Sequence, residues 1–345
     1  MTPVGVAGKR AGLIRVLANR LWLNDAFRRD PQLAAERIRS PIVILGLPRS
    51  GTTKLHRMIA ADPAMQKLPL WRLLNPVRAL APAPPGSTVD ARVAAAHQFV
   101  EALRTRSPDT FAAHPMDALE PDEEYFGMEL SFLSHLNTSS FHTPSYEAWL
   151  NAQSFAPWYH WLERLLQYAQ HSDGASGRPW VLKAPHHLGY LQLLFAQFPD
   201  ATVVHCHRDP TTAVASFCAL LQASRRSTSS RVDAHAIGQY VMRSYGQRMQ
   251  RYLSDRTTLE RHHRFVDLPY PEIVKDAPGA IARCYAAAGL PLSASSLEAM
   301  KAWESQNRQH GHGRHQYELA DFGLTTADVE RAFGAYAARF ARELH

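Results

Sequence analysis

The sequence predicts an α/β protein in which helices flank a central parallel β-sheet. A full core is possible because 46% of the 345 residues are hydrophobic and 20% are charged, a composition that excludes disordered, collagenous and low-complexity chains. Short apolar runs bounded by proline or glycine are typical of strands buried on both faces. Helical patterns alternate with these runs, and this order is typical of a parallel sheet.

The first strand is expected in the wholly apolar run PIVILG, residues 41–46. Helical spacing precedes it from residue 8 to residue 38, where Ser40-Pro41 ends the pattern. A helix is expected after it, from Thr52 to about Ala61, with its apolar side chains facing inward. The strand and the second helix are therefore joined by a short glycine-containing loop.

A helical insert is expected at about residues 81–172. The stretch LAPAPPGSTVD, residues 80–90, opens it, because its prolines and its Gly-Ser pair prevent regular pairing. The insert contains an acidic stretch at 117–129 and an aromatic helix whose apolar spacing, from Trp158 to Leu166, is that of a core face. We accordingly expect a helical extension at residues 1–40 and one domain at 41–345 that carries the insert.

The α/β pattern resumes after the insert. It comprises a strand and loop at 180–185, a helix at 186–198, a strand at 201–207, a helix at 209–221 capped by Asp209, a strand at 263–268, a helix from about Asp276 to Gly289 and a last helix at about 326–342. The basic segment SRRSTSSR, Ser224–Arg231, is expected to be a flexible loop. Whether that loop closes over a ligand or only connects two elements is left open.

The charge balance favours an anionic partner. Lys and Arg number 38 against 31 Asp and Glu, a formal net charge of +7, so a small anion or a nucleic acid is the natural candidate. The three cysteines, Cys206, Cys218 and Cys284, have neither CxxC nor metal spacing, which indicates a reducing compartment.

The chain is expected to be cytoplasmic and not stably inserted in a membrane. Its first residues lack the apolar core of a signal peptide, and no run reaches about 18 apolar residues. The Arg-rich amphipathic start is compatible with contact to a membrane surface, but a helix packed on its own domain is the favoured interpretation. The oligomeric state is not predicted.

The motif GLPRSGTT, Gly46–Thr53, lies directly between the first strand and its helix. A loop at this position exposes backbone N–H groups and the positive end of a helix dipole, and both attract a phosphate-like anion. Its two glycines permit a tight path, its threonines add hydroxyl donors, and Arg49 adds a guanidinium that suits tetrahedral oxyanions. The nucleotide-triphosphatase loop GxxxxGK[ST] has a lysine where this chain has Thr52, and this difference argues against ordinary ATP or GTP hydrolysis.

With the second block, HCHRDPTTAVASF at residues 205–217, GLPRSGTT resembles the sulfotransferases that use 3′-phosphoadenosine 5′-phosphosulfate (PAPS). The resemblance implies a P-loop-NTPase-like fold with the insert over the active site, and a reaction that transfers a sulfuryl group to a hydroxyl, or less readily an amine. It implies that the loop binds the 5′-phosphosulfate through Pro48, Arg49, Ser50, Gly51, Thr52 and Thr53. It also implies that Arg208 and Ser216 bind the 3′-phosphate.

A third block, WVLKAPHHLGYL, is similar to the bacterial and tyrosylprotein-type branch of that family. In that branch a lysine before proline reaches the sulfuryl group, and this role maps to Lys183. Lys183 would neutralise the bridging oxygen as the S–O bond breaks, while Arg49 would neutralise the leaving 5′-phosphate. The late segment GHGRHQY, Gly311–Tyr317, resembles the family's cofactor-covering segment, so Arg314 is expected to complete the 3′-phosphate site. The resemblance spans about residues 40–340.

A base for the acceptor hydroxyl is expected in the insert segment FAAHPMDALEPDEEYF. His114 is the first choice, since a neutral imidazole can accept a proton at working pH. Glu123 and Glu124 compete with it, and the sequence does not decide among His114 and the glutamates of 120–124. The expected acceptor is a small alcohol, in its favoured form amphipathic.

Two other functions are weighed against this one. A P-loop nucleotide or small-molecule kinase shares the sheet and the loop but needs the missing lysine and a Mg²⁺ ligand. A nucleic-acid binder would use the positive charge. Neither explains two anion-binding motifs at two strand ends, so we expect no nucleic-acid partner, and the sequence shows no metal-ligand pattern that would predict a metal.

Overall fold

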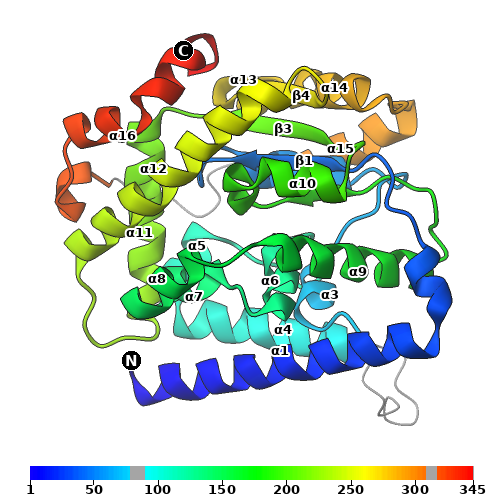
Figure 1. The fold of residues 1–345 in the computed structure, drawn as a ribbon, viewed down its shortest axis with the longest axis horizontal. Coiled ribbons are helices and arrows are strands. Elements are labelled where there is room, and N and C mark those ends of the chain that lie inside the picture. Colours follow the sequence, from blue (N-terminus) through cyan, green and yellow to red (C-terminus); the bar gives the residue numbers. More distant parts are fainter. Residues whose placement is uncertain (78–89, 308–316, 345) are drawn as a thin grey trace. The chain divides into compact units, whose positions relative to one another are not determined.

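The computed structural model describes residues 1–77, 90–307 and 317–344 (Figure 1). Its sheet has four parallel strands in the order β2–β1–β3–β4. The strands are β1 (Ile42–Gly46), β2 (Val181–Lys183), β3 (Thr202–His207) and β4 (Arg264–Pro269). Ile42 of β1 pairs with Val181 and with Thr202, and Thr202 pairs with Arg264. The predicted parallel sheet is confirmed, and the carboxyl ends of β1, β3 and β4 meet at one edge.

The described residues divide into two compact units. The sheet unit takes its residues from 39–67, 178–222 and 233–345, and the helical unit from 1–38, 68–177 and 223–232. Besides the strands, the sheet unit contains α2 (Thr52–Ala60), η3 (Pro185–Gly189), α10 (Leu191–Gln197), most of α11 (Pro210–Arg226), α12 (Ala234–Leu259), α13 (Tyr270–Lys275), α14 (Ala277–Ala288), α15 (Ala294–Gln306), η4 (Leu319–Phe322), α16 (Thr326–Arg339) and α17 (Ala341–Leu344).

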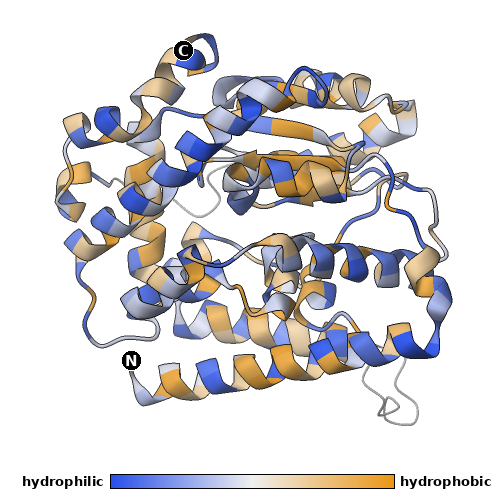
Figure 2. Cartoon of the chain, in the orientation of Figure 1, coloured by the Kyte–Doolittle hydropathy of each residue, from blue (hydrophilic) through white to orange (hydrophobic). Residues whose placement is uncertain are grey.

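One face of the sheet forms the main core of the sheet unit. Alternate residues of β1, β3 and β4 are buried there against α2, α14 and α15, and the cluster includes Ile42, Ile44, Val204, Cys206, Val266, Leu268, Leu55, Met58, Ile59, Ile281, Cys284 and Met300. All five residues of β1 are buried, because helices also cover the opposite face, and Figure 2 shows the central strands as orange, hydrophobic segments. The inward orientation predicted for the apolar side chains of the 52–61 helix is confirmed.

The opposite face of the sheet carries polar side chains. His205 and His207 of β3 alternate with the apolar residues of the main core, and both are fully buried. His205 Nδ1 lies 2.7 Å from the hydroxyl oxygen of Tyr252 on α12, and His207 Nδ1 lies 3.0 Å from that of Tyr336 on α16. Helices α12 and α16 therefore pack on the face opposite to α2 and α14.

The helical unit contains the insert and the amino-terminal helix. Its elements are α1 (Pro3–Arg29), η1 (Pro31–Ala35), α3 (Leu70–Leu74), α4 (Ala91–Arg106), α5 (Pro108–Ala113), α6 (Tyr125–Met128), η2 (Glu129–Ser131), α7 (His135–Ser140), α8 (Pro144–Asn151), α9 (Ala156–Ser172) and the end of α11. The aromatic helix is confirmed as α9, whose side chains Trp158, Tyr159, Trp161, Leu162, Leu165 and Leu166 are all buried. Most of the proline-rich stretch at 80–90 lies outside the described residues.

Two helices differ from the sequence prediction at their ends. The helix expected at 8–38 runs as α1 from Pro3 to Arg29, because Pro31 forces Asp30 into an extended conformation and a short 3₁₀ turn follows. The helix expected at 326–342 ends at Arg339, where Phe340 leaves the helical region and packs its ring 4.4 Å from that of His207.

Two other predictions in the second half of the chain were wrong. The helix expected at 186–198 is broken at Tyr190 into η3 and α10, where the backbone of Gly189 packs so closely on Arg248 of α12 that a Cβ atom would lie 2.9 Å from its side chain. The segment 224–231 is not wholly a loop, since α11 extends to Arg226. Arg225 is buried and donates hydrogen bonds to the carbonyls of Thr138 and Ser139 in the helical unit.

Candidate active site at the carboxyl edge of the sheet

The loop between β1 and α2 depends on two glycines. Gly46 has φ +153°, and a Cβ atom there would lie 2.4 Å from the carbonyl oxygen of Cys206 on β3. Gly51 has φ +87° and caps α2, and a Cβ atom there would lie 3.1 Å from the ring of Tyr270. The loop can therefore hold its backbone close to the neighbouring strand ends only with glycine at these positions. It presents the first N–H groups of α2 at the sheet edge.

Arg49 brings the two predicted anion-binding motifs together. Its Nε donates to Ser216 Oγ at 3.2 Å, and its carbonyl oxygen accepts a hydrogen bond from Arg208 Nη1 at 2.6 Å. Its backbone has φ +74°, a conformation that residues other than glycine rarely adopt. Burial and the nearby Arg208 guanidinium lower the pKa of Arg49 from its ordinary value. Two guanidinium groups are thus held near each other at the edge, an arrangement that an anion would stabilise.

The loop also contains hydroxyl groups suited to an anion. Ser50 is fully buried, and within the described residues its Oγ has no hydrogen-bond partner. Thr52 is buried as well, at the first position of α2. A buried hydroxyl without a partner costs free energy, so Ser50 is a donor available to an oxyanion placed in the loop.

Lys183 approaches the same helix from the other neighbouring strand. It is the last residue of β2, it is fully buried, and its Nζ lies 3.3 Å from Oγ1 of Thr53 on α2. A buried ammonium is costly unless negative charge or hydrogen bonds compensate it. The structure therefore places this cation at the start of α2, whereas Arg49 points to Ser216 of α11.

A cavity of about 350 Å³ opens beside the loop. Its lining residues are Gly51, Lys54, Tyr270, Ile273, Val274, Trp303, Glu304 and Asn307. Tyr270 lines this cavity and also contacts Arg208, whose guanidinium carbon lies 4.2 Å from the centre of the tyrosine ring. Lys54 Nζ forms an ion pair with Glu304 at 2.7 Å on its wall. The volume is that of small-molecule sites, and two aromatic rings border it.

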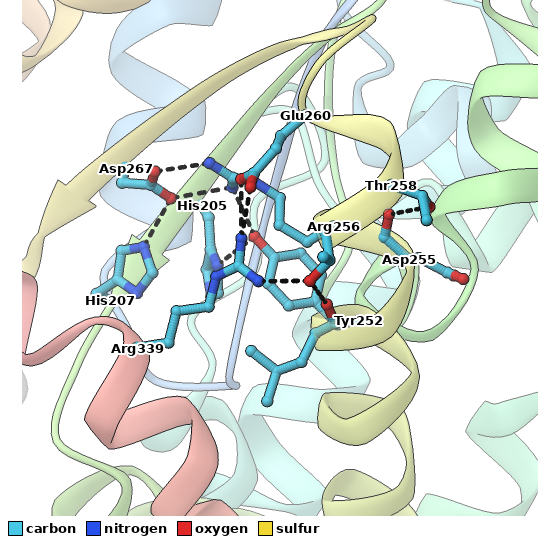
Figure 3. A network of polar contacts seen from close by, with 11 residues as sticks. His205, His207, Tyr252, Asp255, Arg256, Thr258, Glu260, Asp267 and Arg339 are labelled. Atoms are coloured by element: carbon cyan, nitrogen blue, oxygen red, sulfur yellow. Dashed lines mark hydrogen bonds and ion pairs between the residues drawn. The ribbon is translucent and has the colours of Figure 1, made fainter.

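A buried polar network joins His207 of β3, Arg256 of α12 and Asp267 of β4 (Figure 3). Asp267 of β4 accepts hydrogen bonds from Arg256 at 2.8 and 3.1 Å and from His207 Nε2 at 3.0 Å. With that proton on Nε2, His207 Nδ1 accepts the hydroxyl proton of Tyr336, and the Tyr336 oxygen accepts the backbone N–H of Arg208. An unbroken chain of hydrogen bonds thus connects α12 and β4 to the backbone of Arg208.

The same network is poorly suited to a metal ion. His205, His207 and Asp267 offer ligand atoms within 4.8 Å of one another among the described residues. Arg256, however, already gives the Asp267 carboxylate two hydrogen bonds, and its guanidinium would repel a cation bound there. Burial alone would raise the pKa of Asp267, but the hydrogen bonds from His207 and Arg256 hold it well below its ordinary value.

Comparison with known proteins identifies the family. The sequence profile of the sulfotransferase family matches residues 41–294 of this chain. The chain belongs to the sulfotransferase family. Its matched region contains the loop, Lys183, Arg208 and Ser216.

Proteins similar to this sulfotransferase occur in mycobacteria. It is 25% identical over 318 residues to omega-hydroxy-beta-dihydromenaquinone-9 sulfotransferase Stf3 of Mycobacterium bovis, covering 88% of this chain and 76% of Stf3. Its structure is similar to that of STF1 from Mycobacterium tuberculosis, with 31% identity, a TM-score of 0.76 and coverage of 97% and 87% of the two chains. STF9 from Mycobacterium avium gives 26% identity, a TM-score of 0.83 and coverage of 98% and 86%. The P-loop-like fold predicted for this sulfotransferase is thereby confirmed.

The residues considered as bases of the sulfotransferase lie in the helical unit. His114 follows α5, and its Nε2 lies 3.3 Å from Oδ1 of Asp122, which is almost fully buried. A hydrogen bond to this carboxylate favours the tautomer that leaves Nδ1 free to accept a proton. Glu124 is buried, and Glu123 is half-buried. The sequence analysis did not predict Asp122 as a partner of His114, although Asp122 lies in the acidic stretch only eight residues after it.

Some other residues of the candidate site were not predicted from the sequence, and one predicted residue lies outside the described part of the chain. Arg314, expected at the 3′-phosphate, lies outside the described residues. Tyr270 was missed, although its place directly after β4 is the same strand-end signal that identified Arg208. Tyr336 and Arg256 carry no local signal, because they reach the sheet from distant helices.

Proposed function

We propose that this sulfotransferase uses PAPS as its donor and an amphipathic alcohol as its acceptor. The observation that carries the proposal is the position of Arg49, which contacts Arg208 through its backbone and Ser216 through its side chain. The loop motif and the strand-end motif therefore meet at one edge of the sheet. A nucleotide with anionic groups at both its 3′ and 5′ positions has the charge distribution to occupy both.

The 5′ end of the donor binds at the loop in this proposal. Backbone N–H groups at the start of α2 and the hydroxyls of Ser50, Thr52 and Thr53 donate to the phosphosulfate oxygens. Lys183 stands at the start of α2, 3.3 Å from Thr53, and stabilises the negative charge that develops on the phosphate as the S–O bond breaks. On donor binding, the Arg49 side chain either turns from Ser216 toward the 5′-phosphosulfate or contacts both the 5′-phosphosulfate and the 3′-phosphate. In either position its positive charge stays beside the donor.

The 3′ end and the base have separate sites. Arg208 and Ser216 hold the 3′-phosphate, and Arg314 completes this shell. The cavity beside Gly51 accepts the adenine, since Tyr270 and Trp303 provide apolar aromatic surface for a flat ring. Neighbouring hydrogen bonds fix the Arg208 backbone before the ligand arrives, so less ordering is required on binding.

The reaction is an in-line displacement on sulfur. The acceptor oxygen forms a new S–O bond, the bond between sulfur and the bridging oxygen breaks, and adenosine 3′,5′-bisphosphate departs with the electron pair. His114, oriented by Asp122, takes the hydroxyl proton, with Glu124 as the alternative base. The relative Stf3 bears the name of a menaquinone sulfotransferase, which supports a lipid-like alcohol as the acceptor class.

Thermal unfolding with adenosine 3′,5′-bisphosphate, measured beside ATP, tests the donor. A ligand at a hundred times its Kd stabilises the folded chain by about 2.7 kcal/mol, so the bisphosphate should raise Tm by several degrees and ATP by less. Arg208→Ala should lose this shift, whereas the control Arg331→Ala, at an exposed arginine paired with Asp328, should keep it. An equal shift with ATP, or none with the bisphosphate, would overturn the proposal.

A further inference from the structure

The outward face of α1 carries large aliphatic side chains that solvent reaches. These are Val4, Val6, Leu13, Ile14, Leu17 and Leu21, and their exposed fractions range from 38% for Leu13 to 66% for Leu21. Successive residues of an α-helix are 100° apart around its axis, so the five from Val6 to Leu21 fall within an arc of about 100°. Figure 2 shows orange, hydrophobic segments recurring along this helix. We call these five residues the α1 stripe.

The stripe is not the face by which α1 packs on its own unit. Val16, Asn19 and Leu23 are buried on another side of the helix, and Asn19 Nδ2 donates to the carbonyl of Leu74 at 3.2 Å. Near the amino end, a Cβ atom on Gly5 would lie 2.4 Å from the carbonyl oxygen of Thr228. Close contacts along the helix therefore fix its rotation. The sequence prediction of a helix packed on its own domain describes one face, and a second apolar face is left in solvent.

The charge of α1 points to an anionic partner. Between Pro3 and Asn24 the helix contains Lys9, Arg10, Arg15 and Arg20 and no acidic residue. Arg10 is exposed and lies within the arc of the stripe. Lys9 and Arg20 lie beside the stripe and are half-buried; they donate to the neutral oxygens of Asn137 and Leu130, so their charge is not cancelled there, whereas Arg15 pairs with Glu129. A helix with an aliphatic stripe and basic flanks is suited to the boundary between lipid headgroups and acyl chains.

A second copy of the chain fits this face less well. At 1.5 Å per residue and roughly 10 Å of width, the stripe offers about 230 Å². Two copies would bury about 460 Å² in total, well under the roughly 1,200 Å² of a stable interface. Pairing two copies would also place the arginines of two α1 helices near each other, and their positive charges would repel. A negatively charged partner causes no such repulsion.

We propose that α1 lies flat on an anionic lipid surface, with the α1 stripe inserted among the acyl chains, Arg10 at the headgroups, and the charges of Lys9 and Arg20 beside them. Such binding is peripheral: no described helix combines the length and the apolar content that crossing a bilayer requires. The proposal is independent of the donor and acceptor assigned above.

Sedimentation of the full chain with lipid vesicles tests this proposal. We expect binding to vesicles of phosphatidylcholine with 30% phosphatidylglycerol and at least tenfold weaker binding to phosphatidylcholine alone, because the basic residues attract only the anionic surface. The double variant Leu17→Glu, Leu21→Glu should lose at least tenfold in affinity for the mixed vesicles. The matched control is Leu119→Glu, since Leu119 is 57% exposed but lies outside α1.

Three results would overturn the proposal. The first is wild-type protein that does not sediment with mixed vesicles, and the second is a double variant that binds as well as the Leu119→Glu control. The third is wild-type protein that is dimeric by light scattering and becomes monomeric in the double variant without any vesicle binding. Circular dichroism melting of all variants confirms that each is folded, as expected for substitutions at exposed positions.

Discussion

Asp267 is the residue on which the polar network behind Arg208 depends. Its carboxylate joins Arg256 to His207, and His207 leads through Tyr336 to the Arg208 backbone. Removing one partner of a buried ion pair leaves the other charge uncompensated. The residue does not touch the donor in the proposed reaction, so its expected effect is on positioning.

Asp267→Asn should lower both stability and donor affinity. We expect a loss of about 2–3 kcal/mol in the free energy of unfolding, since the carboxylate is partly exposed and Arg256 keeps Glu260 as a partner. KM for the donor should rise while kcat changes little. The control Asp255→Asn, next to Arg256 on α12 and bonded to Gln192, should change neither quantity. A fall in kcat with unchanged KM would contradict the positioning role.

The choice between His114 and Glu124 is also decided at single residues. His114→Gln and Glu124→Gln, assayed from pH 5.5 to 9, should differ because only the true base must lose its proton before the reaction. We expect His114→Gln to reduce kcat by 10²–10⁴ and to abolish its rise with pH. Retention of that rise in His114→Gln and its loss in Glu124→Gln would reverse the assignment.

At the scale of elements, the strand-to-helix loop tolerates almost no added volume. A Cβ atom on Gly46 would meet the Cys206 carbonyl at 2.4 Å and Ser50 Oγ at 2.7 Å, so Gly46→Ala must push β1 and β3 apart or move the loop. Gly334 is the contrasting case, since it lies inside α16 with no atom within 4 Å of its Cβ position.

We expect opposite signs for alanine at these two glycines. Gly46→Ala should lower Tm by many degrees and abolish donor binding, whereas Gly334→Ala should stabilise the chain by about 0.5–1 kcal/mol through helix propensity. Differential scanning calorimetry with and without the bisphosphate measures both effects. Normal stability and donor binding in Gly46→Ala would show that the loop adapts more easily than its packing indicates.

The elements differ in how far the sequence predicts them. All four strands and the helices at 52–60 and 277–288 were found, because proline, glycine or a capping aspartate marks their ends. Helix α12 was not found, although it has 26 residues. Its buried residues Ile237, Val241, Tyr245, Met249 and Tyr252 recur at helical spacing, so a local signal was present and was overlooked. The burial of Arg248 and Arg256 on the same helix depends on tertiary partners that a sequence does not reveal.

The residues of the candidate site also differ in whether the sequence predicts them. Arg49, Lys183, Arg208 and Ser216 stand at strand ends or on the helices that follow, where motif and position together predict them. Tyr336, Arg256 and Asp267 act through contacts between segments up to 129 residues apart in the chain, as between His207 and Tyr336. Local patterns therefore identify the groups proposed to face the donor, but not the residues that hold those groups in place.

The whole molecule should lose stability on mild acidification. Burial lowers the pKa of His205 and His186 well below the ordinary value, so the folded chain keeps both imidazoles neutral. The unfolded chain takes up these protons below about pH 6.5, and each then favours unfolding. The stability that both residues contribute is present above that pH and declines below it.

Urea unfolding at pH 8 and at pH 5.5 measures this decline. We expect a lower free energy of unfolding at pH 5.5, with a slope of up to about 1.4 kcal/mol per pH unit for each histidine. His205→Gln should reduce the slope, although it also weakens the contact with Tyr252. Equal or greater stability at pH 5.5 would show that these imidazoles are protonated in the folded chain.

Arg49 combines a left-handed backbone with the side chain that joins the two motifs. Glycine would adopt that backbone without the roughly 1–3 kcal/mol that other residues pay in such conformations. Screening for heat resistance alone would therefore select glycine at position 49 and discard the guanidinium. Under the proposed reaction, the arginine at this position would exchange robustness of the fold for turnover.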